Sequence, residues 1–259
     1  MNSICVLIII LLLSLMIVGG QQGLKTFLGL VLNFFLIFTL IILVNWGFNP
    51  YIVMAIISLM ILSVAIYLSA GRAKVMAIAW QSSLVVTTVV GCLSFLTQHF
   101  AQVQGYTLEN SDELEGLSLN IGINFSHLVV IVMVISALGA IAEASMAITA
   151  DLFEVIDRSP DITKESLSEH AETIGSQILG TAVNTLFFGM LGANIPLLIW
   201  YLRLHYTLAE FINAKLLVME VATMLLGMIG ILLSIWLSTY MVERRYHKEG
   251  RNLLDESDI

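Results

Sequence analysis

Residues 26–71 read TFLGLVLNFFLIFTLIILVNWGFNPYIVMAIISLMILSVAIYLSAG, and these 46 residues include no Lys, Arg, Asp or Glu. A helix needs about 20 apolar residues to cross the roughly 30 Å of bilayer hydrocarbon, so this stretch is long enough for two crossings. The hexapeptide NWGFNP at 45–50 interrupts it with residues that are typical of turns. We therefore predict two spanning helices joined by a turn.

The rest of the chain has the same apolar character. Hydrophobic residues make up 58% of the 259 residues and charged residues 12%, whereas soluble domains are about 45–50% apolar and 25% charged. This composition excludes a soluble globular fold, a disordered chain and a fibrous repeat. Five further uncharged intervals suit one helix each: 2–24, 75–108, 116–142, 173–202 and 221–242. We predict an all-α, polytopic transmembrane bundle of about seven spans, near 3–20, 24–46, 51–69, 76–97, 120–147, 178–202 and 216–239.

The basic residues predict how the bundle is oriented, because short cytoplasmic loops accumulate Lys and Arg. Seven alternating spans place only Arg203 and Lys215 on one side. The other side takes Lys25, Arg72, Lys74, Arg158, Lys164, Arg244, Arg245, Lys248 and Arg251. We therefore expect the N-terminus outside and the C-terminus in the cytoplasm, with the bundle over 1–242 and a cytoplasmic tail over 243–259. The first span has no basic n-region and a poor cleavage site, so we expect it to be retained.

Missing motifs narrow the functional classes. The chain has no GxxxxGK[ST] loop for nucleotides, no HExxH or GxSxG motif and no basic stripe for nucleic acid. Cys5 and Cys92 lie in apolar spans without the spacing of metal ligands. We expect a protein that is not an enzyme, has no cofactor or metal, and binds neither nucleotide nor nucleic acid. The partner that its composition implies is the lipid bilayer.

Two connecting segments, 98–118 and 158–177, carry four acidic residues each. The external loop over 98–118 contains Glu109, Asp112, Glu113 and Glu115. We expect a hydrated acidic loop there, and the alternative is a vestibule that collects cations.

Residues 158–177 predict a helix lying at the cytoplasmic surface, with Ser159-Pro160 as its N-cap and first helical position. An acidic polar face matches anionic lipid poorly, so we expect this helix to dock against this protein or a partner. The apolar face consists of Leu167, Ala171, Ile174 and Ile178. The candidate partner surface consists of Glu154, Asp157, Glu165, Glu169 and Glu172.

The fifth span contains a carboxylate, Glu143, in or beside the bilayer. A charge at the bilayer centre costs roughly 2.5–3.5 kcal/mol on insertion scales, so such a residue usually faces the bundle or water and marks function. At 100° per residue, one small and acidic face holds Ser136, Gly139, Ala140, Glu143, Ala147, Ala150, Glu154 and Asp157. The face could line a path or make a close helix contact. The alternative is that Glu143 is already hydrated at the cytoplasmic interface and has no role.

The sixth span offers a second polar position. Thr181, Asn184 and Phe188 fall near one face, and we expect Asn184 to point its amide into the bundle. Pro196 frees a backbone carbonyl one turn back and is expected to kink the helix. Such a carbonyl could coordinate an ion, although kinks and small residues are also ordinary packing devices in membranes.

These two spans resemble the YibE/F family of bacterial multipass membrane proteins over residues 137–198. The segment ALGAIAEASMAITADLFE at 137–154 is similar to the family's small-residue helix with an embedded acidic residue and a later Glu. The similarity continues at Gly175, Ile178-Leu179-Gly180-Thr181, Asn184-Thr185-Leu186 and Pro196-Leu197-Leu198. The chain departs from the family pattern at Glu143, where the family usually has Asp, and at Ser176-Gln177, where it tends to have Arg-Asp.

The resemblance implies a multipass protein of the bacterial plasma membrane, often of Gram-positive bacteria, and often a paralogous YibE/F-type membrane protein as partner. It implies no particular substrate. Our leading hypothesis is a permease-type subunit for a small ion or metabolite. The path residues would be Ser136, Gly139, Glu143, Ala147, Thr181, Asn184 and Pro196, with Glu143 as a cation or proton site. The alternative is a non-transporting membrane subunit that holds or regulates a partner membrane protein.

Overall fold

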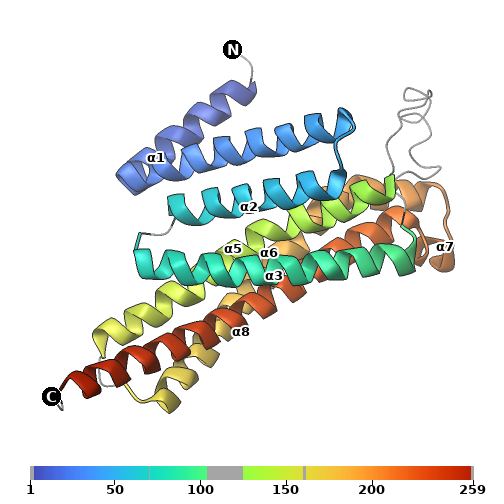
Figure 1. The fold of residues 1–259 in the computed structure, drawn as a ribbon. Helices are drawn as coiled ribbons and strands as arrows, with labels where there is room; N and C mark the ends of the chain where they lie inside the picture. The colour runs from blue at the N-terminus through green and yellow to red at the C-terminus, as the bar shows by residue number, and fades with distance from the viewer. Residues whose placement is uncertain (1–2, 70, 104–124, 160–161, 258–259) are drawn as a thin grey trace.

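The computed structural model describes residues 3–69, 71–103, 125–159 and 162–257, and these residues form helices without any strand (Figure 1). In chain order the helices are α1 (Ser3–Asn45), α2 (Pro50–Ser69), α3 (Ala73–Ala101), α5 (Phe125–Arg158), α6 (Lys164–Arg203), α7 (Leu208–Ile212) and α8 (Lys215–Ser257). Within the described ranges, all of them except the short α7 are long and apolar enough to cross a membrane. The prediction of an all-α polytopic bundle is confirmed.

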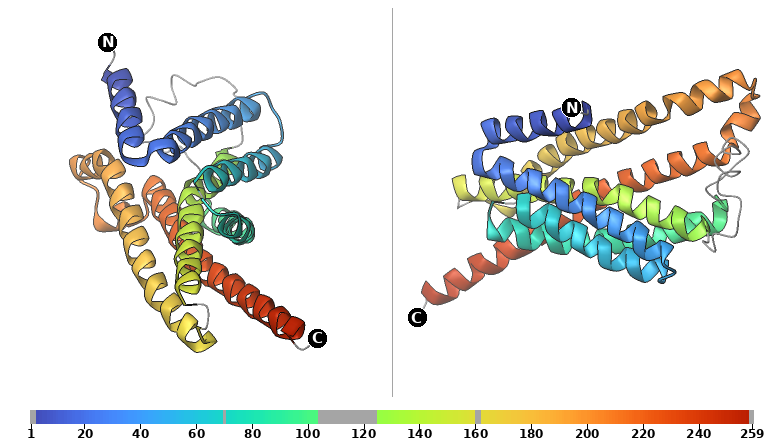
Figure 2. Two further views of the ribbon diagram at one scale, coloured as in Figure 1. Left: turned by 90° about the vertical axis from the view of Figure 1, so that its left-hand side faces the viewer. Right: turned by 90° about the horizontal axis from the view of Figure 1, so that it is seen from above.

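Helix α1 is broken at Gly20, where the backbone has φ 54° and ψ −128°. The two halves fold back on each other and form a V (Figures 1 and 2). Gly23 makes this reversal possible, since a Cβ atom there would lie 1.8 Å from the carbonyl oxygen of Leu15. The six long helices therefore contain seven apolar segments, in agreement with the predicted number.

The turn between α1 and α2 lies where the sequence predicts it. Gly47 adopts φ 87°, a conformation that residues with a Cβ rarely take. The side-chain oxygen of Asn49 accepts hydrogen bonds from the backbone N–H groups of Tyr51 (3.1 Å) and Ile52 (3.4 Å). Asn49 thus satisfies two of the free donors at the start of α2.

Helix α5 is the centre of the bundle and packs against α2, α3, α6 and α8 (Figure 2). Its apolar face is fully buried, as at Met133, Ile141 and Ile148. Helix α8 approaches it closely at Gly230, where a Cβ atom would lie 2.9 Å from Cγ1 of Ile141. The core therefore surrounds α5: one cluster lies among α1, α2, α3 and α5, a second among α3, α5 and α8, and a third reaches α6.

The helix ends divide the basic residues as predicted. The connections from α2 to α3 and from α5 to α6 lie at the end of the bundle where α8 finishes, and α7 lies at the opposite end (Figure 1). Arg72, Lys74, Arg158 and Lys164 are therefore at one end, and Arg203 and Lys215 at the other. Which end faces the cytoplasm stays a prediction. The acidic loop residues Glu109, Asp112, Glu113 and Glu115 lie outside the described residues.

The expected surface helix over 158–177 is not a separate element. Arg158 ends α5, and α6 runs unbroken from Lys164 to Arg203, about 60 Å at 1.5 Å per residue. Pro160, the predicted first helical position, lies outside the described residues. Helix α6 starts after Thr163, whose side chain accepts a hydrogen bond from the N–H of Ser166 (3.3 Å). Residues 164–177 are therefore the N-terminal turns of the long helix α6.

The apolar face of this part of α6 packs against the protein itself, one of the two options that the sequence left open. Leu167 is fully buried and Ala171 is almost so. Both belong to a cluster with Leu152 of α5 and Val242 of α8. This contact holds the first part of α6 against α5 and α8.

Candidate functional site

Glu143 lies in a cavity of about 490 Å³ between α5 and the junction of α2 with α3. Its side chain is exposed, and no hydrogen bond or ion pair is formed by it within the part of the chain that the structure describes. The other residues that line the cavity are Ser69, Gly71, Arg72, Val75, Met146, Ala147, Ala150 and Glu154. The cavity thus combines small side chains with three charged groups.

The other two acidic side chains nearby are neutralised by arginines. Nη1 of Arg72 is 2.5 Å from Oδ2 of Asp157, so the start of α3 is tied to the last turn of α5. Arg158 forms an ion pair with Glu154, four residues earlier on the same helix. Both pairs are more than half exposed, so each is expected to stabilise the fold by less than about 1 kcal/mol. Glu143 remains an unpaired carboxylate beside them.

Glu143 lies beside the C-terminal end of α2, and α5 extends well beyond this point. Its cavity reaches Ser69, the last residue of α2. From Glu143 to Arg158, α5 extends about 22 Å further at 1.5 Å per residue. The carboxylate therefore lies level with the end of α2, on the exposed face of α5.

The predicted small and acidic face of α5 exists, but it lies outside the core. Ser136, Gly139 and Glu143 are exposed and Ala147 is half-buried. A Cβ atom at Gly139 would meet nothing within 4 Å. This face is consequently uncovered by other helices of the described chain along much of its length.

The polar positions of α6 differ from the prediction. Asn184 was expected to point into the bundle, yet it is exposed, as are Thr181 and Pro196. The reason is that α6 lies at the edge of the bundle and contacts it through its other face (Figure 2). The backbone of α6 also stays helical through Pro196. Thr181 satisfies its hydroxyl within α6, by donating to the carbonyl of Gln177 (3.1 Å).

The structure brings together only part of the predicted path. Glu143 and Ala147 line the cavity, and Ser136 and Gly139 continue the same face of α5 beyond it. None of the α6 candidates is among the lining residues. Of the predicted partner surface, Glu154 and Asp157 lie on α5 and are paired with arginines. The remaining members are exposed on the first turns of α6: Glu165, Glu169 and Glu172.

A buried group of hydroxyls was not recognised as a unit from the sequence. Six fully buried residues on three helices belong to it: Ser82 and Ser83 of α3, Ser145 and Thr149 of α5, and Ser234 and Ser238 of α8. Oγ of Ser238 donates to Oγ of Ser82 at 2.8 Å. With Gly230 beside Ile141, the helix register puts Ser145 level with Ser234 and Thr149 level with Ser238. The four-residue spacing of these pairs on α5 and α8 was the available signal.

We predict that this hydroxyl pair couples α3 to α8 weakly. Replacing Ser82 and Ser238 by Ala, singly and together, should give a coupling free energy of about 0.6 kcal/mol, the mean for such bonds in membranes. The measurement is a double-mutant cycle on unfolding in mixed micelles, followed by circular dichroism. The exposed Thr88, whose hydroxyl bonds only within α3, is the control partner for Ser238 and should show no coupling.

No curated protein and no solved structure matches this chain. The family model described as YibE/F-like protein matches residues 7–248.

Proposed function

The chain belongs to the YibE/F-like family, and from that premise we propose that it is a permease-type subunit for a small ion or metabolite, with Glu143 as its cation or proton site. We propose no catalytic reaction for it. Its place would be the plasma membrane of a bacterium, where its apolar helices form a multipass membrane protein.

The observation that carries the proposal is the unpaired carboxylate of Glu143 in a cavity at the end of the spanning helices. Ionisable side chains in spanning helices are expensive, and they commonly mark ion or proton pathways. The neighbouring carboxylates have arginine partners, so Glu143 is the one in this cavity that is available for a cation. Small residues such as Ala147 and Ala150 leave space around it.

We further propose that a second membrane chain, a paralogous YibE/F-type protein, completes the path. The small face of α5 beyond the cavity, at Ser136 and Gly139, is exposed to its surroundings in the single chain. The same holds for Thr181 and Asn184 on α6. Small residues let helices approach closely in membranes, and amide groups bond across helices there. A second chain on these faces would enclose the route to Glu143.

The proposal is tested with protein reconstituted from its own membrane into liposomes that contain the pH-sensitive dye pyranine. Gradients of Na⁺, K⁺ and Mg²⁺ are imposed in turn, and proton and cation movements are followed. We expect at least one gradient to drive movement several-fold faster than in liposomes without protein. Rates equal to those of empty liposomes under every gradient would contradict a permease role for these cations and a proton or cation site at Glu143.

The second candidate function is a non-transporting subunit that holds a partner. What favours it is the exposure of Glu165, Glu169 and Glu172 on the part of α6 that is fixed against α5 and α8. Three carboxylates on consecutive turns give a surface to which a basic partner could bind.

A charge reversal distinguishes the two functions. Changing Glu165, Glu169 and Glu172 to Lys together should remove a co-purifying partner from native mass spectra if this surface holds it, because like charges would then face each other. The matched control changes the same residues to Asp and retains the charges. A complex that survives the Lys substitutions while cation movement is unchanged would count against the holding function.

A further inference from the structure

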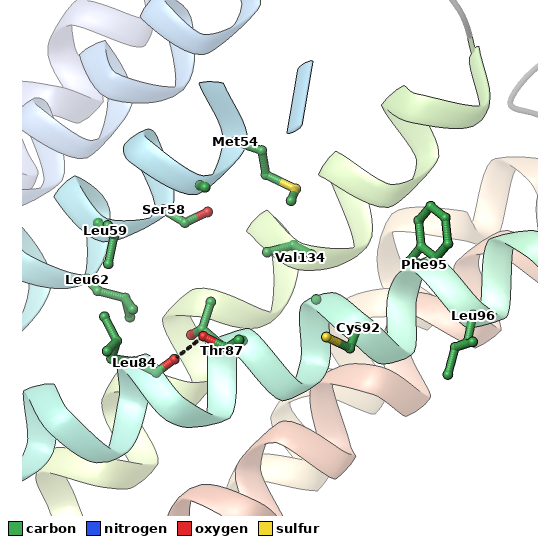
Figure 3. Close-up of a pocket in the computed structure, with 13 residues that line it drawn as sticks. Met54, Ser58, Leu59, Leu62, Leu84, Thr87, Cys92, Phe95, Leu96 and Val134 are labelled. Atoms are coloured by element: carbon green, nitrogen blue, oxygen red, sulfur yellow. Dashed lines mark hydrogen bonds between the residues drawn. The ribbon is translucent and has the colours of Figure 1, made fainter. Parts of the chain in front are cut away.

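A second cavity, of about 660 Å³, lies between α2 and α3, with α5 behind it (Figure 3). Its volume is within the range of about 300–1,000 Å³ that ligand pockets usually have. The lining is mostly apolar, and the thirteen residues that form it include none with a charge: Met54, Ala55, Ser58, Leu59, Leu62, Leu84, Thr87, Thr88, Gly91, Cys92, Phe95, Leu96 and Val134. This cavity is separate from that of Glu143.

Two hydroxyls in the lining lack hydrogen-bond partners. Oγ of Ser58 and Oγ1 of Thr87 are both buried, and neither makes a hydrogen bond in the described structure. The residue Ser58 as a whole is only 4% exposed. Hydroxyls in spanning helices normally donate to a carbonyl one turn back, as Ser63 and Thr88 do at 2.7 and 2.9 Å. Leaving a buried hydroxyl unpaired costs free energy, so these two are suited to a group that occupies the cavity.

The two hydroxyls lie at nearly the same depth. Nε1 of Trp80 donates to Oγ of Ser63 at 3.1 Å, which sets the antiparallel register of α3 against α2. In that register Ser58 is level with residue 85, about 3 Å along the axis from Thr87 at 1.5 Å per residue. The two unpaired hydroxyls therefore lie at a similar level between α2 and α3.

The cavity is closed at both ends along the helix axes. The bond between Trp80 and Ser63 joins α2 to α3 directly beyond Leu62 on α2 and one turn beyond Leu84 on α3. At the other end the ring of Tyr51 packs against those of Phe95 (centroids 6.3 Å apart) and His127 (4.8 Å). The lining comes from α2, α3 and Val134 of α5, and no other described helix contributes to it, so the remaining opening is sideways between α2 and α3. An occupant would enter from the lipid phase.

The depth of the hydroxyls restricts the occupant further. Ser58 is eight residues into α2, about 12 Å from its start, and so lies well inside the hydrocarbon region. The oxygens of phospholipid headgroups stay at the edge of that region. We propose that this cavity binds an uncharged, membrane-dissolved molecule with a long apolar body and a small oxygen-bearing head, an alcohol or a ketone. The head bonds to Ser58 and Thr87, and the body lies along the leucines.

The test uses the full-length protein in liposomes and a long-chain alcohol with a mid-chain diazirine, together with the alkane of the same length and label. After illumination, peptide mass spectrometry locates and quantifies the attached probe. We expect attachment of the alcohol at lining residues of α2 and α3, several-fold above that of the alkane. Equal attachment of both probes would show that the groove binds apolar chains without selecting for a hydroxyl, and this would overturn the proposal. Absence of attachment by either probe would also overturn it.

Variants make the test specific. Ser58→Ala with Thr87→Val should lower alcohol attachment at least about fivefold and leave the alkane unchanged, since only the hydrogen bonds are lost. Thr39→Val is the matched control, because that hydroxyl lies on α1 outside the cavity and is already bonded to the carbonyl of Phe35, and it should keep wild-type attachment. Gly91→Leu should exclude both probes, since a Cβ there meets only Val134 at 4.0 Å and the larger side chain fills the cavity. Wild-type attachment in the double variant would overturn the proposal.

Discussion

Glu143→Ala is expected to reduce cation or proton movement in liposomes at least about tenfold, which corresponds to about 1.4 kcal/mol of lost stabilisation of the moving ion. The reason is that Glu143 is the carboxylate of its cavity without an arginine partner. Glu143→Asp should retain a measurable part of the rate, because the charge remains on a side chain shorter by one methylene. The rates are measured with pyranine under the gradient that is most effective for the wild type.

Asp151→Ala is the matched control for this experiment. Asp151 is another exposed carboxylate of α5, two turns further along, and it is not among the residues that line the cavity of Glu143. Its loss should leave the rate near the wild-type value. Wild-type movement in Glu143→Ala would refute Glu143 as the ion site. Equal losses in both variants would indicate a general effect of negative charge on α5.

Gly23→Ala should open the reversal of α1, the second large effect that we predict. The added Cβ would lie 1.8 Å from a backbone oxygen, so the two halves of the helix must separate. Spin labels at Cys5 and at residue 34 after Phe34→Cys, in a Cys92→Ser background, report this by pulsed electron paramagnetic resonance. A straight helix puts these positions about 44 Å apart at 1.5 Å per residue, and the folded wild type should give a clearly shorter distance.

Gly19→Ala is the control for Gly23→Ala. A Cβ atom at Gly19 meets nothing within 4 Å, so the label distance should stay that of the wild type. If Gly23→Ala also kept the short distance, the reversal would not depend on the close approach of Leu15. Gly20→Ala is expected to act like Gly23→Ala, since Gly20 has a positive φ that strains any other residue.

The helices of this protein could be predicted from its sequence because charges and turn residues are easily located along the chain. The gaps between charged residues gave the spans, and NWGFNP gave the turn that Gly47 and Asn49 form. The face that each helix turns toward the others was harder to predict. Apolar residues can face lipid or protein equally well in a bilayer, so hydropathy could not show that Asn184 lies on an outer face.

The site was predicted in part for the same reason. Glu143 and Ala147 were identified because a carboxylate among small residues is rare in a span, and both line one cavity. The junction of α2 and α3, which supplies Arg72 to that cavity, is far from Glu143 in sequence and had no motif to indicate it. The cavity at Ser58 and Thr87 depends on the separation of two helices, and no local pattern encodes that separation.

The unbroken length of α6 has a mechanical consequence. A continuous helix is stiff, and α6 runs without a break from its first turns, packed at Leu167 against α5 and α8, to its far end at Arg203. A soluble protein that pulls on these first turns would therefore apply a torque to α5 through the cluster at Leu152. The helix that carries Glu143 would turn with it. We predict that a force applied to the first turns of α6 can in this way reposition the carboxylate of Glu143.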